Sequence, residues 1–551
     1  MQELRESLQR AAKELYSVDI EPEFSRPEER FGDYSTNAAL QLAAKLNQPP
    51  RVIAEALSAR LEAEEAVSKA ETAGPGFINI FLTDKALLAG LKSRAPQAYS
   101  GQTIVVEYSD PNPFKVLHVG HLYTSVVGDA IANLYEASGA KVARVNFGGD
   151  VGLHVAKTMW AIVHKLEGES PDGLGSIKPA ERADWLAERY VEGNAAYESG
   201  ELKRDINDLN KRIYQIAGQN DRESGLSRIY WTTRQWSYDY FDDFYRRIAC
   251  RFDRYYPESE TTEPGLKVVR ENIGKVFEES QGAIVFKGEV HNMHTRVFIN
   301  SEGLPTYETK DVGLLFKKWQ DYRFDRSIVI TGNDIYEYMQ VVLKAVEQIE
   351  PALARKTIHI THGMVKATGG VKMSSRLGNI IRAEDVLDAA STANQKSNQQ
   401  DSSEVALGAV KYAFLKNRLG ADMVFDPAES VSLQGNSGPY LQYAYVRAKS
   451  IMQKSSNSHS LSDEKLEADE RSLARKIGGF SEVVERATQE MLPSHVCTYL
   501  YELAQNFNRF YEKNRIIGDS REPLRLMLVK KYAEVLQEGL RLLNIPAPEK
   551  M

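Results

Sequence analysis

The chain has 551 residues, of which 42% are hydrophobic and 26% are charged, and its formal net charge at pH 7 is −7. These are the proportions of a globular protein, and the length suggests about three or four domains. The acidic balance does not point to a nucleic-acid partner, although a local basic face can still bind phosphates. No apolar run approaches the roughly 20 residues that a membrane helix requires.

The sequence carries neither an export signal nor a cysteine framework. Residues 1–15 mix acidic and basic side chains and lack the apolar stretch of a signal peptide. The two cysteines, Cys250 and Cys497, form no CxxC pair and no Cys/His cluster, which argues against a disulfide framework and a structural zinc site. We therefore expect a cytoplasmic protein with no metal ligands among its site residues.

Residues 1–100 are predicted to form a separate small α/β module. Helical patterns at residues 2–15 and 50–70 flank the segment 31–40, and residues 74–82 are typical of a turn followed by a strand. The Gly-Pro-Gly at 74–76 is compatible with a tight turn or with a loop that approaches a phosphate.

Residues 101–385 predict an α/β fold, a doubly wound nucleotide-binding sheet. A β-branched run at 104–106 leads through a proline-broken loop into a helical pattern, which Gly139 is expected to end before a strand at 142–145. Further strands are expected at 327–331 and 357–361. Residues 165–290 interrupt the alternation and are interpreted as an insertion. The apolar face of the first helix consists of Leu122, Val126, Val127, Ala130, Ile131 and Leu134.

The remainder, residues 386–551, is predicted to be a helical domain. The polar tract at 391–404 (STANQKSNQQDSSE) is interpreted as a linker or a mobile loop, and residues 454–465 as a loop between helices. Beyond the tract the pattern predicts helices to the end of the chain.

The sequence HVGH at 118–121 lies where the first loop of the central region becomes a helix. Helix N-terminal amides favour an anion, and Gly120 has no side chain, so a phosphate or an adenine ring can approach the backbone. The imidazoles of His118 and His121 can donate hydrogen bonds to α-phosphate oxygens as charge builds there. Taken alone, the pattern is equally compatible with a plain helix start.

A second pattern, GMVKATGGVKMSSRLGN at 363–379, combines glycines, lysine and serines in one loop. Lys372 can place a positive charge on the β- and γ-phosphates, and the hydroxyls of Ser374 and Ser375 add donors. Such a tripeptide is common in ordinary surface loops. Together with HVGH, however, it predicts a site that binds and splits ATP.

The two motifs resemble those of class I aminoacyl-tRNA synthetases, and within them the arginyl-tRNA synthetase family. SDPNPFKVLHVGHL (109–122) is similar to the S-P-N-x-A-K-x-x-H-[VI]-G-H signature of that family, and KMSSR (372–376) to its KMS loop. The resemblance extends along nearly the whole chain. It also covers FGDYSTNAAL (31–40), GPGFINIF (74–81), residues 241–259, LPTYETKDVG (304–313), SGPYLQYAYVRAKSI (437–451), FNRFYEKNRI (507–516) and LLNIPAPEKM (542–551).

The resemblance implies a Rossmann-type catalytic domain with an insertion, a tRNA-binding N-terminal domain and an all-helical anticodon-binding domain. It implies catalytic roles for His118, His121, Lys115 and Lys372. The implied ATP-binding residues are Gly120, Gly332, Asp334, Met364, Val365, Ser374 and Ser375. The implied arginine-binding residues are Glu107, Asp110, Asn112, Tyr307, Asp311 and Gln340.

Arginine recognition also has a physical rationale, since a guanidinium presents a planar fork of donors that pairs with carboxylates. Individually, Glu107 and Asp311 are equally compatible with structural salt bridges. The chain departs from the family pattern at four positions. Ser375 replaces the usual second lysine of the loop, so Lys115 is expected to supply charge; Asp110 replaces Ser or Ala; Val151 and His154 stand where Trp and Gln are more usual.

The implied reaction joins L-arginine and ATP into arginyl-adenylate and then transfers arginine to tRNA(Arg). The resemblance implies that adenylate formation needs bound tRNA. We expect ATP as a substrate, Mg²⁺ held mainly by ATP and water, and a monomeric enzyme. The aromatic residues Tyr443, Tyr445, Phe510 and Tyr511 are compatible with anticodon stacking or with a helical core.

Three other functions are considered. A synthetase of the glutamine or glutamate type has similar motifs. A small-molecule nucleotidylyltransferase also carries HxGH, but it has no use for the helical C-terminal region. A non-catalytic tRNA-binding paralogue is expected to lack the pair of motifs that this chain retains.

Overall fold

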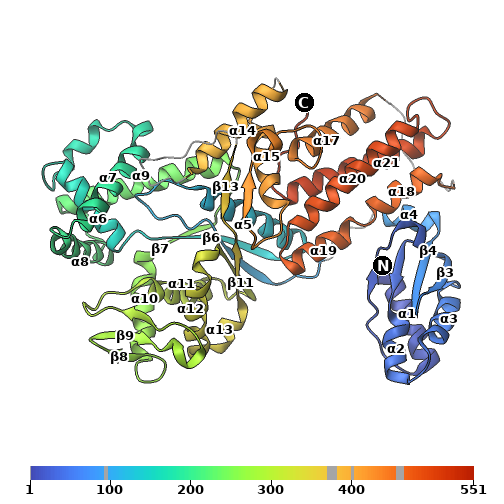
Figure 1. The fold of residues 1–551 in the computed structure, drawn as a ribbon, viewed down its shortest axis with the longest axis horizontal. Helices are drawn as coiled ribbons and strands as arrows, with labels where there is room; N and C mark the ends of the chain where they lie inside the picture. The colour runs from blue at the N-terminus through green and yellow to red at the C-terminus, as the bar shows by residue number, and fades with distance from the viewer. Residues whose placement is uncertain (1, 92–96, 369–380, 399–401, 455–464) are drawn as a thin grey trace. The chain divides into compact units, whose positions relative to one another are not determined.

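The computed structural model describes residues 2–91, 97–368, 381–398, 402–454 and 465–551. These residues fall into two compact units (Figure 1). The first unit comprises Met1–Ala95, Arg447–Val483 and Tyr499–Gln537, and the second comprises Pro96–Val446, Val484–Thr498 and Glu538–Met551.

The first unit contains the N-terminal α/β module, built on a four-stranded antiparallel sheet in the order β1-β2-β4-β3. The predicted turn is confirmed, because β3 and β4 are joined through Gly74–Gly76. The predicted helix at 50–70 is too long, since α3 ends at Leu61 and a strand follows. The elements are α1 (Gln2–Tyr16), β1 (Phe24–Ser25), β2 (Tyr34–Thr36), α2 (Ala38–Leu46), α3 (Pro50–Leu61), β3 (Val67–Ala73), β4 (Phe77–Leu82) and α4 (Asp84–Gly90).

The second unit is organised around five parallel strands in the order β12-β11-β5-β6-β7. Chain order reverses between β5 and β11, so this is the doubly wound arrangement, in which ligands bind beyond the carboxyl ends of the strands at the reversal. The predicted fold class is confirmed. The strands are β5 (Thr103–Glu107), β6 (Lys141–Gly148), β7 (Arg254–Pro257), β11 (Arg326–Gly332) and β12 (Thr357–His362).

Helix α5 (Val119–Ala137) follows β5 and packs on this sheet. All six apolar residues predicted to share one face are at most 2% exposed, which confirms the helical pattern. Gly139 ends this segment with a φ of +92°, a conformation that glycine adopts without strain.

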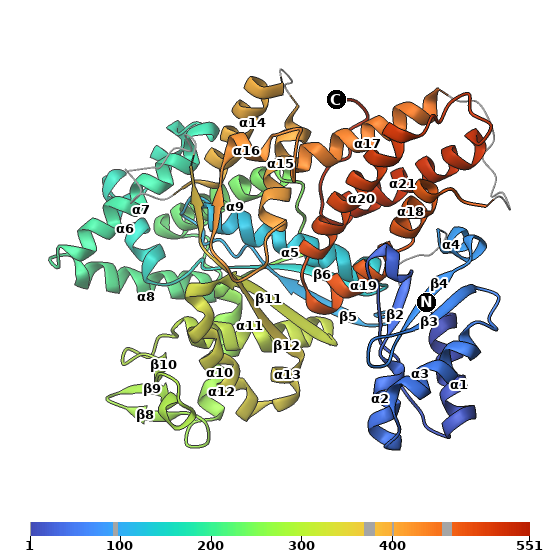
Figure 2. The same cartoon turned by 45° about the vertical axis from the view of Figure 1, so that its right-hand side comes forward.

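The predicted insertion is largely helical, as expected, but it also holds strands. β7 is the fifth strand of the parallel sheet, and β8 and β9 form a small antiparallel sheet with β10, which lies just beyond residue 290 (Figure 2). β7 escaped prediction because its four residues, RYYP, lack a run of aliphatic residues. The elements are α6 (Leu153–Lys165), α7 (Arg182–Glu198), α8 (Lys203–Gln219), α9 (Gly225–Arg247), α10 (Glu258–Glu271), β8 (Glu278–Ser280), β9 (Ala283–Phe286) and β10 (Arg296–Ile299).

The central region continues with helices that precede and separate β11 and β12 in the chain, and β13 then pairs in parallel with β14 (Met423–Phe425). The interpretation of 391–404 as a linker is wrong for most of the tract, because α14 continues to Asn398. The polar composition concealed a helix whose inner residues, Val386, Ala390 and Asn394, are buried. The elements are α11 (Tyr307–Tyr322), α12 (Tyr336–Ile349), α13 (Pro351–Lys356), β13 (Val365–Ala367), α14 (Ala383–Asn398) and α15 (Ser403–Leu415).

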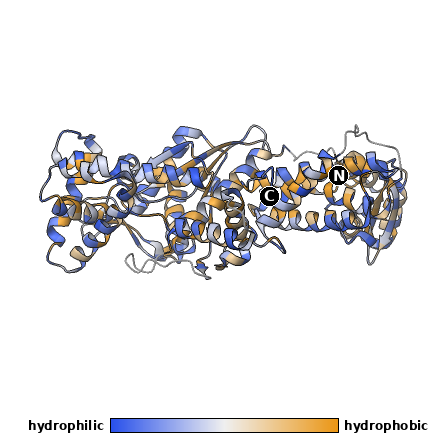
Figure 3. Cartoon of the chain, turned by 90° about the horizontal axis from the view of Figure 1, so that it is seen from above, coloured by the Kyte–Doolittle hydropathy of each residue, from blue (hydrophilic) through white to orange (hydrophobic). Residues whose placement is uncertain are grey.

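The C-terminal part is helical apart from β14 (Met423–Phe425), which corrects the expectation that it is helical throughout. Its helices are α16 (Pro427–Ser430), α17 (Gly438–Gln453), α18 (Ala468–Ile477), α19 (Phe480–Glu490), α20 (Ser494–Lys513) and α21 (Glu522–Leu542). Most of the loop predicted at 454–465 lies outside the described residues. Hydrophilic and hydrophobic residues alternate along the helices (Figure 3), and within the described ranges none is long and apolar enough to span a bilayer.

Candidate functional site

The candidate site lies at the carboxyl ends of β5 and β11, where the chain order of the sheet reverses. The segment after β5 is strained, because Ser109, Asp110 and Phe114 have positive φ angles of 76°, 49° and 69°. Non-glycine residues adopt this conformation at a cost, and such strain is concentrated at functional sites. The strained backbone and the HVGH motif thus lie in the same connection from β5 into α5.

The two histidines of HVGH cap α5 with their own side chains. The amide of Gly120 donates to Nδ1 of His118, and the amide of His118 donates to Nδ1 of His121, both over 3.1 Å. The rings are stacked with centroids 3.8 Å apart. A Cβ atom on Gly120 would lie 2.9 Å from the His118 ring, so the glycine is required by this ring as well as by any ligand.

Burial determines the charge of both rings, and these hydrogen bonds determine which nitrogen carries the proton. Burial and the nearby charge of Lys115 lower the pKa of His118 to about 4, and burial and His118 lower the pKa of His121 well below its ordinary value. Both rings are therefore neutral at pH 7. Since each Nδ1 is an acceptor, each Nε2 carries a proton and is available as a donor.

The loop before α5 is tied to the segment that follows the second motif. The amide of Val119 donates to the carbonyl of Ile381 over 2.9 Å, and the amide of Ala383 donates to the carbonyl of Leu117 over 3.0 Å. The chain on the far side of the KMSSR loop is therefore held against HVGH. Lys372, Ser374 and Ser375 lie outside the described residues.

Lys115, the other predicted catalytic lysine, is half-buried. Its Nζ atom lies 4.6 Å from the centroid of the Tyr190 ring on α7, a cation–π distance. It is also close enough to His118 and His154 to lower the pKa of each. The ammonium group therefore lies among the imidazoles of the site.

The ATP-binding candidates at β11 and β13 have defined partners. A Cβ atom on Gly332 would lie 2.5 Å from Oδ1 of Asp334, so the glycine makes room for this exposed carboxylate. The amide of Met364 donates to Asp422 over 2.9 Å, and its carbonyl accepts from the amide of Met423. An adenine ring would have to use the second lone pair of that carbonyl or the backbone of Val365.

Two buried ion pairs lie beside the sheet end. Glu107 accepts from Nζ of Lys318, which also donates to Ser327 over 3.2 Å, and Glu258 accepts from Nζ of Lys310. All four charged side chains of these pairs are at most 5% exposed. Glu107 thus forms a structural ion pair, which is one of the two roles that its sequence position left open.

Two further carboxylates in this region have no cation within 4.0 Å among the described residues, namely Asp110 and Asp311. Asp110 accepts from the amide of Phe147 over 2.8 Å, and Asp311 accepts from the hydroxyl of Tyr338. Burial raises both pKa values, that of Asp311 to about 7. The charge of Glu107 adds to both shifts, and the charge of Glu258 adds to that of Asp311. The region therefore carries more carboxylates than cations.

Of the remaining arginine-binding candidates, Asn112 contacts Gly149 and Tyr307 is linked to it through His154. The amide of Gly149 donates to Oδ1 of Asn112 over 2.8 Å. A Cβ atom on Gly149 would lie within 3.1 Å of Asn112, His154 and Glu258, so these three side chains converge there. His154 in turn contacts Tyr307, which is 49% exposed. Gln340 is half-buried on α12.

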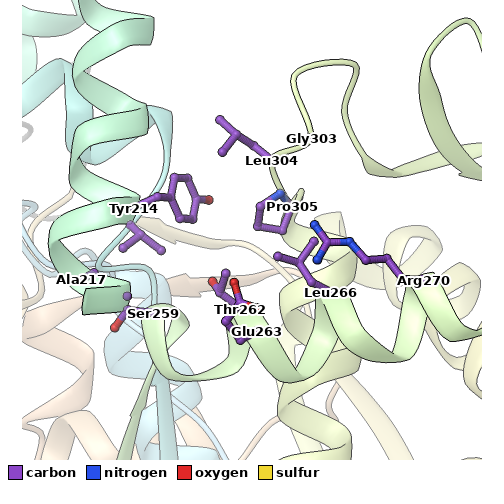
Figure 4. A pocket seen from close by; sticks show the side chains of 12 residues that line it. Tyr214, Ala217, Ser259, Thr262, Glu263, Leu266, Arg270, Gly303, Leu304 and Pro305 are labelled. Atoms are coloured by element: carbon purple, nitrogen blue, oxygen red, sulfur yellow. The ribbon is translucent and has the colours of Figure 1, made fainter. Parts of the chain in front are cut away.

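A cavity opens between α8, α10 and the loop at 303–305 (Figure 4). Tyr214 borders it from α8, and Ser259 and Thr262 border it from α10. A Cβ atom on Gly152 would lie 3.6 Å from each of Tyr214 Oη, Lys310 Nζ and His154 Nδ1. The cavity therefore adjoins the Glu258–Lys310 pair rather than the stacked histidines.

Sequence analysis missed Glu258, Lys310, Lys318 and Tyr338 as members of the site. Glu258 and Lys310 lie within the quoted segments 241–259 and 304–313, and Lys310 is next to the predicted Asp311. Their pairing joins residues 52 apart and that of Glu107 with Lys318 joins residues 211 apart. A single sequence contains no signal for such long-range pairs.

Comparisons with known families cover nearly all of the chain. Residues 83–427 match the family described as tRNA synthetases class I (R), catalytic domain. Residues 2–82 match the arginyl tRNA synthetase N terminal domain, and residues 441–551 match the DALR anticodon binding domain.

Individual relatives match over their full lengths. The chain is 30% identical to an arginine–tRNA ligase of Bdellovibrio bacteriovorus over 570 residues, which covers 98% of this chain and 95% of that protein. It is 26% identical to that of Bacteroides fragilis strain YCH46, with 98% of each chain covered. Thermus thermophilus arginyl-tRNA synthetase superposes with a TM-score of 0.82 at 25% identity and 100% coverage of both chains. The Plasmodium falciparum enzyme shares the fold with a TM-score of 0.81 at 20% identity.

Proposed function

The chain belongs to the class I arginyl-tRNA synthetases, and we propose which of its residues carry out the ligation of arginine to tRNA. In the first step the carboxylate of arginine attacks the α-phosphorus of ATP, and pyrophosphate leaves. In the second step the ribose hydroxyl at the 3′ end of tRNA takes the arginyl group and AMP leaves. Neither step requires a covalent bond to the enzyme, so positioning and charge stabilisation carry the catalysis.

His118 and His121 are assigned to the α-phosphate. Their two Nε2 protons are available, and both rings stay neutral without ligand, so the donors are in place before charge develops. Donors that need no reorganisation stabilise a transition state most effectively. Lys115 and Lys372 are assigned to the phosphate charge, and Gly120, Ser374 and Ser375 to further phosphate contacts.

The nucleoside of ATP is assigned to Gly332 and Asp334 at the ribose and to Met364 and Val365 at the adenine. Mg²⁺ is proposed to enter with ATP, held by phosphate oxygens and water, as is usual for this ion. The described residues contain no group of three or more His, Cys, Asp or Glu side chains arranged to hold a metal.

The arginine specificity rests on one observation, the excess of carboxylates over lysines at the site. Glu107, Asp110, Glu258 and Asp311 face two lysines, and burial, with a further contribution from neighbouring carboxylates, raises the pKa of Asp110 and Asp311. A ligand with a guanidinium and an α-ammonium group relieves this repulsion, whereas glutamine or glutamate adds no positive side chain. Asn112, Tyr307 and Gln340 are assigned to the uncharged contacts.

We assign tRNA binding to the N-terminal module, residues 1–100, and to the helical domain, residues 386–551. Of the four candidate aromatic residues, Tyr445 and Phe510 are 1% exposed and are core residues, whereas Tyr443 is 44% exposed. Tyr443 is therefore the favoured stacking residue. The free, buried cysteines fit a cytoplasmic enzyme, and a monomer is expected, which sedimentation would test.

ATP–pyrophosphate exchange with a panel of amino acids, with and without tRNA, tests the proposal. We expect exchange with arginine and not with glutamine, glutamate or lysine, and only when tRNA is present. Exchange with glutamine or glutamate would overturn the assignment of the carboxylates. Exchange at the same rate without tRNA would overturn the expected tRNA requirement but not the residue roles.

A further inference from the structure

His154 is a departure from the family pattern, and it lies inside the site. It occupies the first turn of α6, and its ring packs against Gly149, beside Asn112 and Glu258. Its Nε2 atom lies 2.7 Å from the carbonyl oxygen of Gly149, and its Nδ1 atom lies 3.1 Å from the hydroxyl of Tyr307. The imidazole thus bridges a backbone carbonyl and a predicted arginine-binding side chain.

The chemistry of these partners determines the direction of both hydrogen bonds. A carbonyl oxygen only accepts, so Nε2 of His154 must carry a proton. Burial and the ammonium groups of Lys115, Lys310 and Lys157 lower the pKa of His154 to about 3, although the bond to Gly149 opposes this. The ring is therefore neutral, Nδ1 is an acceptor, and the Tyr307 hydroxyl must donate to it.

This direction determines what Tyr307 presents to a ligand. With its proton directed at His154, the phenol oxygen keeps only lone pairs for other partners. Lys310 lies over the face of the Tyr307 ring, 4.5 Å from its centroid, so the ring is also held from that side. A guanidinium has donors and no acceptor, and it is complementary to such an oxygen.

We propose that His154 is a positioning and specificity residue for arginine, which accepts the Tyr307 proton and so leaves the phenol oxygen as an acceptor for the substrate guanidinium. The inference rests on the proposed function, because it takes Tyr307 to line the arginine site. A glutamine at position 154 would not determine the direction of the hydrogen bond with Tyr307, because its side-chain amide can turn to present either a donor or an acceptor.

Three variants test the inference in the full-length enzyme with tRNA present. His154→Phe keeps a planar ring but removes both nitrogens, and we expect it to raise the KM for arginine about 3- to 10-fold, the effect of one hydrogen bond. The KM for ATP and the kcat should change less than about twofold. His154→Gln should recover most of the loss, since an amide oxygen can accept the same proton.

The decisive measurement is a double-mutant cycle with Tyr307→Phe. If His154 acts through the Tyr307 hydroxyl, His154→Phe should have almost no further effect on the KM for arginine in the Tyr307→Phe background. His164→Phe, a stacked histidine on the same helix, is the matched control and should change nothing. Nitrogen NMR of the His154 ring should show an unprotonated Nδ1 whose shift changes in Tyr307→Phe.

The possible failures are distinguishable. If Tyr307→Phe alone leaves the KM for arginine unchanged, the placement of Tyr307 in the arginine site is wrong, and the inference falls with it. If Tyr307→Phe raises the KM but His154→Phe multiplies it equally in both backgrounds, only the inference is overturned. A protonated Nδ1 would overturn it as well.

Discussion

The stacked imidazoles of HVGH are fixed by hydrogen bonds from the backbone of their own helix, so removing one ring removes a donor without exposing a charge. We expect His121→Ala to lower adenylate formation by about 10²- to 10³-fold, the usual loss for one transition-state donor. The KM for arginine should change little. Single-turnover adenylate formation measures the effect, and an unchanged rate would contradict the catalytic assignment.

The carboxyl group of Asp311 predicts a pH dependence for arginine binding. Its pKa of about 7 comes mainly from burial, with further contributions from neighbouring carboxylates. A cationic ligand favours the ionised form, and that form falls from about 90% at pH 8 to about 10% at pH 6 for such a pKa. The KM for arginine should therefore rise about tenfold as the pH falls from 8 to 6.

Steady-state kinetics at saturating ATP and tRNA measures this dependence. Asp311→Asn, which cannot ionise, should have a higher KM at pH 8 and a flat profile between pH 6 and 8. A wild-type KM that is constant over this range would show that the carboxyl group is ionised throughout, or that it does not contact the substrate.

Sequence reasoning found individual residues of the site better than their partners. The candidates His118 and Asp311 follow from local motifs; in the structure His118 caps α5 after β5, and Asp311 lies on α11, where it accepts from Tyr338. The same local patterns could not show that Glu107 is already paired with Lys318, or that Asp311 has no cation within 4.0 Å in the described part of the chain. These facts depend on which helix packs against which strand.

Helices α10 and α11 make a close crossing beside the Glu258–Lys310 ion pair. A Cβ atom on Gly265 would lie 2.0 Å from the carbonyl oxygen of Thr309, and one on Gly313 would lie 2.0 Å from that of Thr261. Backbone atoms cannot move as a flexible side chain does. The glycines at the crossing thus allow the close approach of α10 and α11, the helices that carry Glu258 and Lys310.

We expect Gly313→Ala to separate the two helices, to destabilise the protein by about 1 to 3 kcal/mol, and to raise the KM for arginine. Gly218→Ala on α8 is the control, because its Cβ atom would meet nothing within 4 Å. Thermal unfolding and arginine kinetics measure both variants. If the two variants had the same thermal stability and the same KM for arginine, the close crossing would be contradicted.

Helices and strands whose apolar residues recur at a regular spacing were predictable from the sequence, and those without such a spacing were not. α5 has a continuous buried face, and its bounds and burial follow from the sequence. β7 and β14 are strands of four and three residues whose partners lie far away in the chain. α14 was mistaken for a linker because its polar residues face outward while a few small residues and Asn394 pack inward.

At the scale of the molecule, the first unit joins the N-terminal module to helices from the C-terminal region through buried charges. Asp33 is 2% exposed and lies 2.6 Å from Arg471 and 3.3 Å from Arg475, both on α18. Arg26 is paired with Glu482 over 2.7 Å. Two segments about 440 residues apart in sequence are thus held by ion pairs with little access to water.

Removing Asp33 should leave Arg471 with Asp84 as a partner and Arg475 with the carbonyls of Pro27 and Gly32. Breaking a buried pair from one side costs more than the pair contributes. We expect Asp33→Ala to destabilise the first unit by about 3 kcal/mol and to raise the KM for tRNA, with the KM for arginine unchanged. Chemical denaturation and aminoacylation kinetics measure the two effects.

Glu28→Ala is the control. It removes the partner of Arg30 in a pair whose side chains are at least 70% exposed, and it should cost less than about 1 kcal/mol. If Asp33→Ala behaved like Glu28→Ala, the ion pairs of Asp33 would contribute little to holding the N-terminal module, and they would not link tRNA binding to the α18 helix.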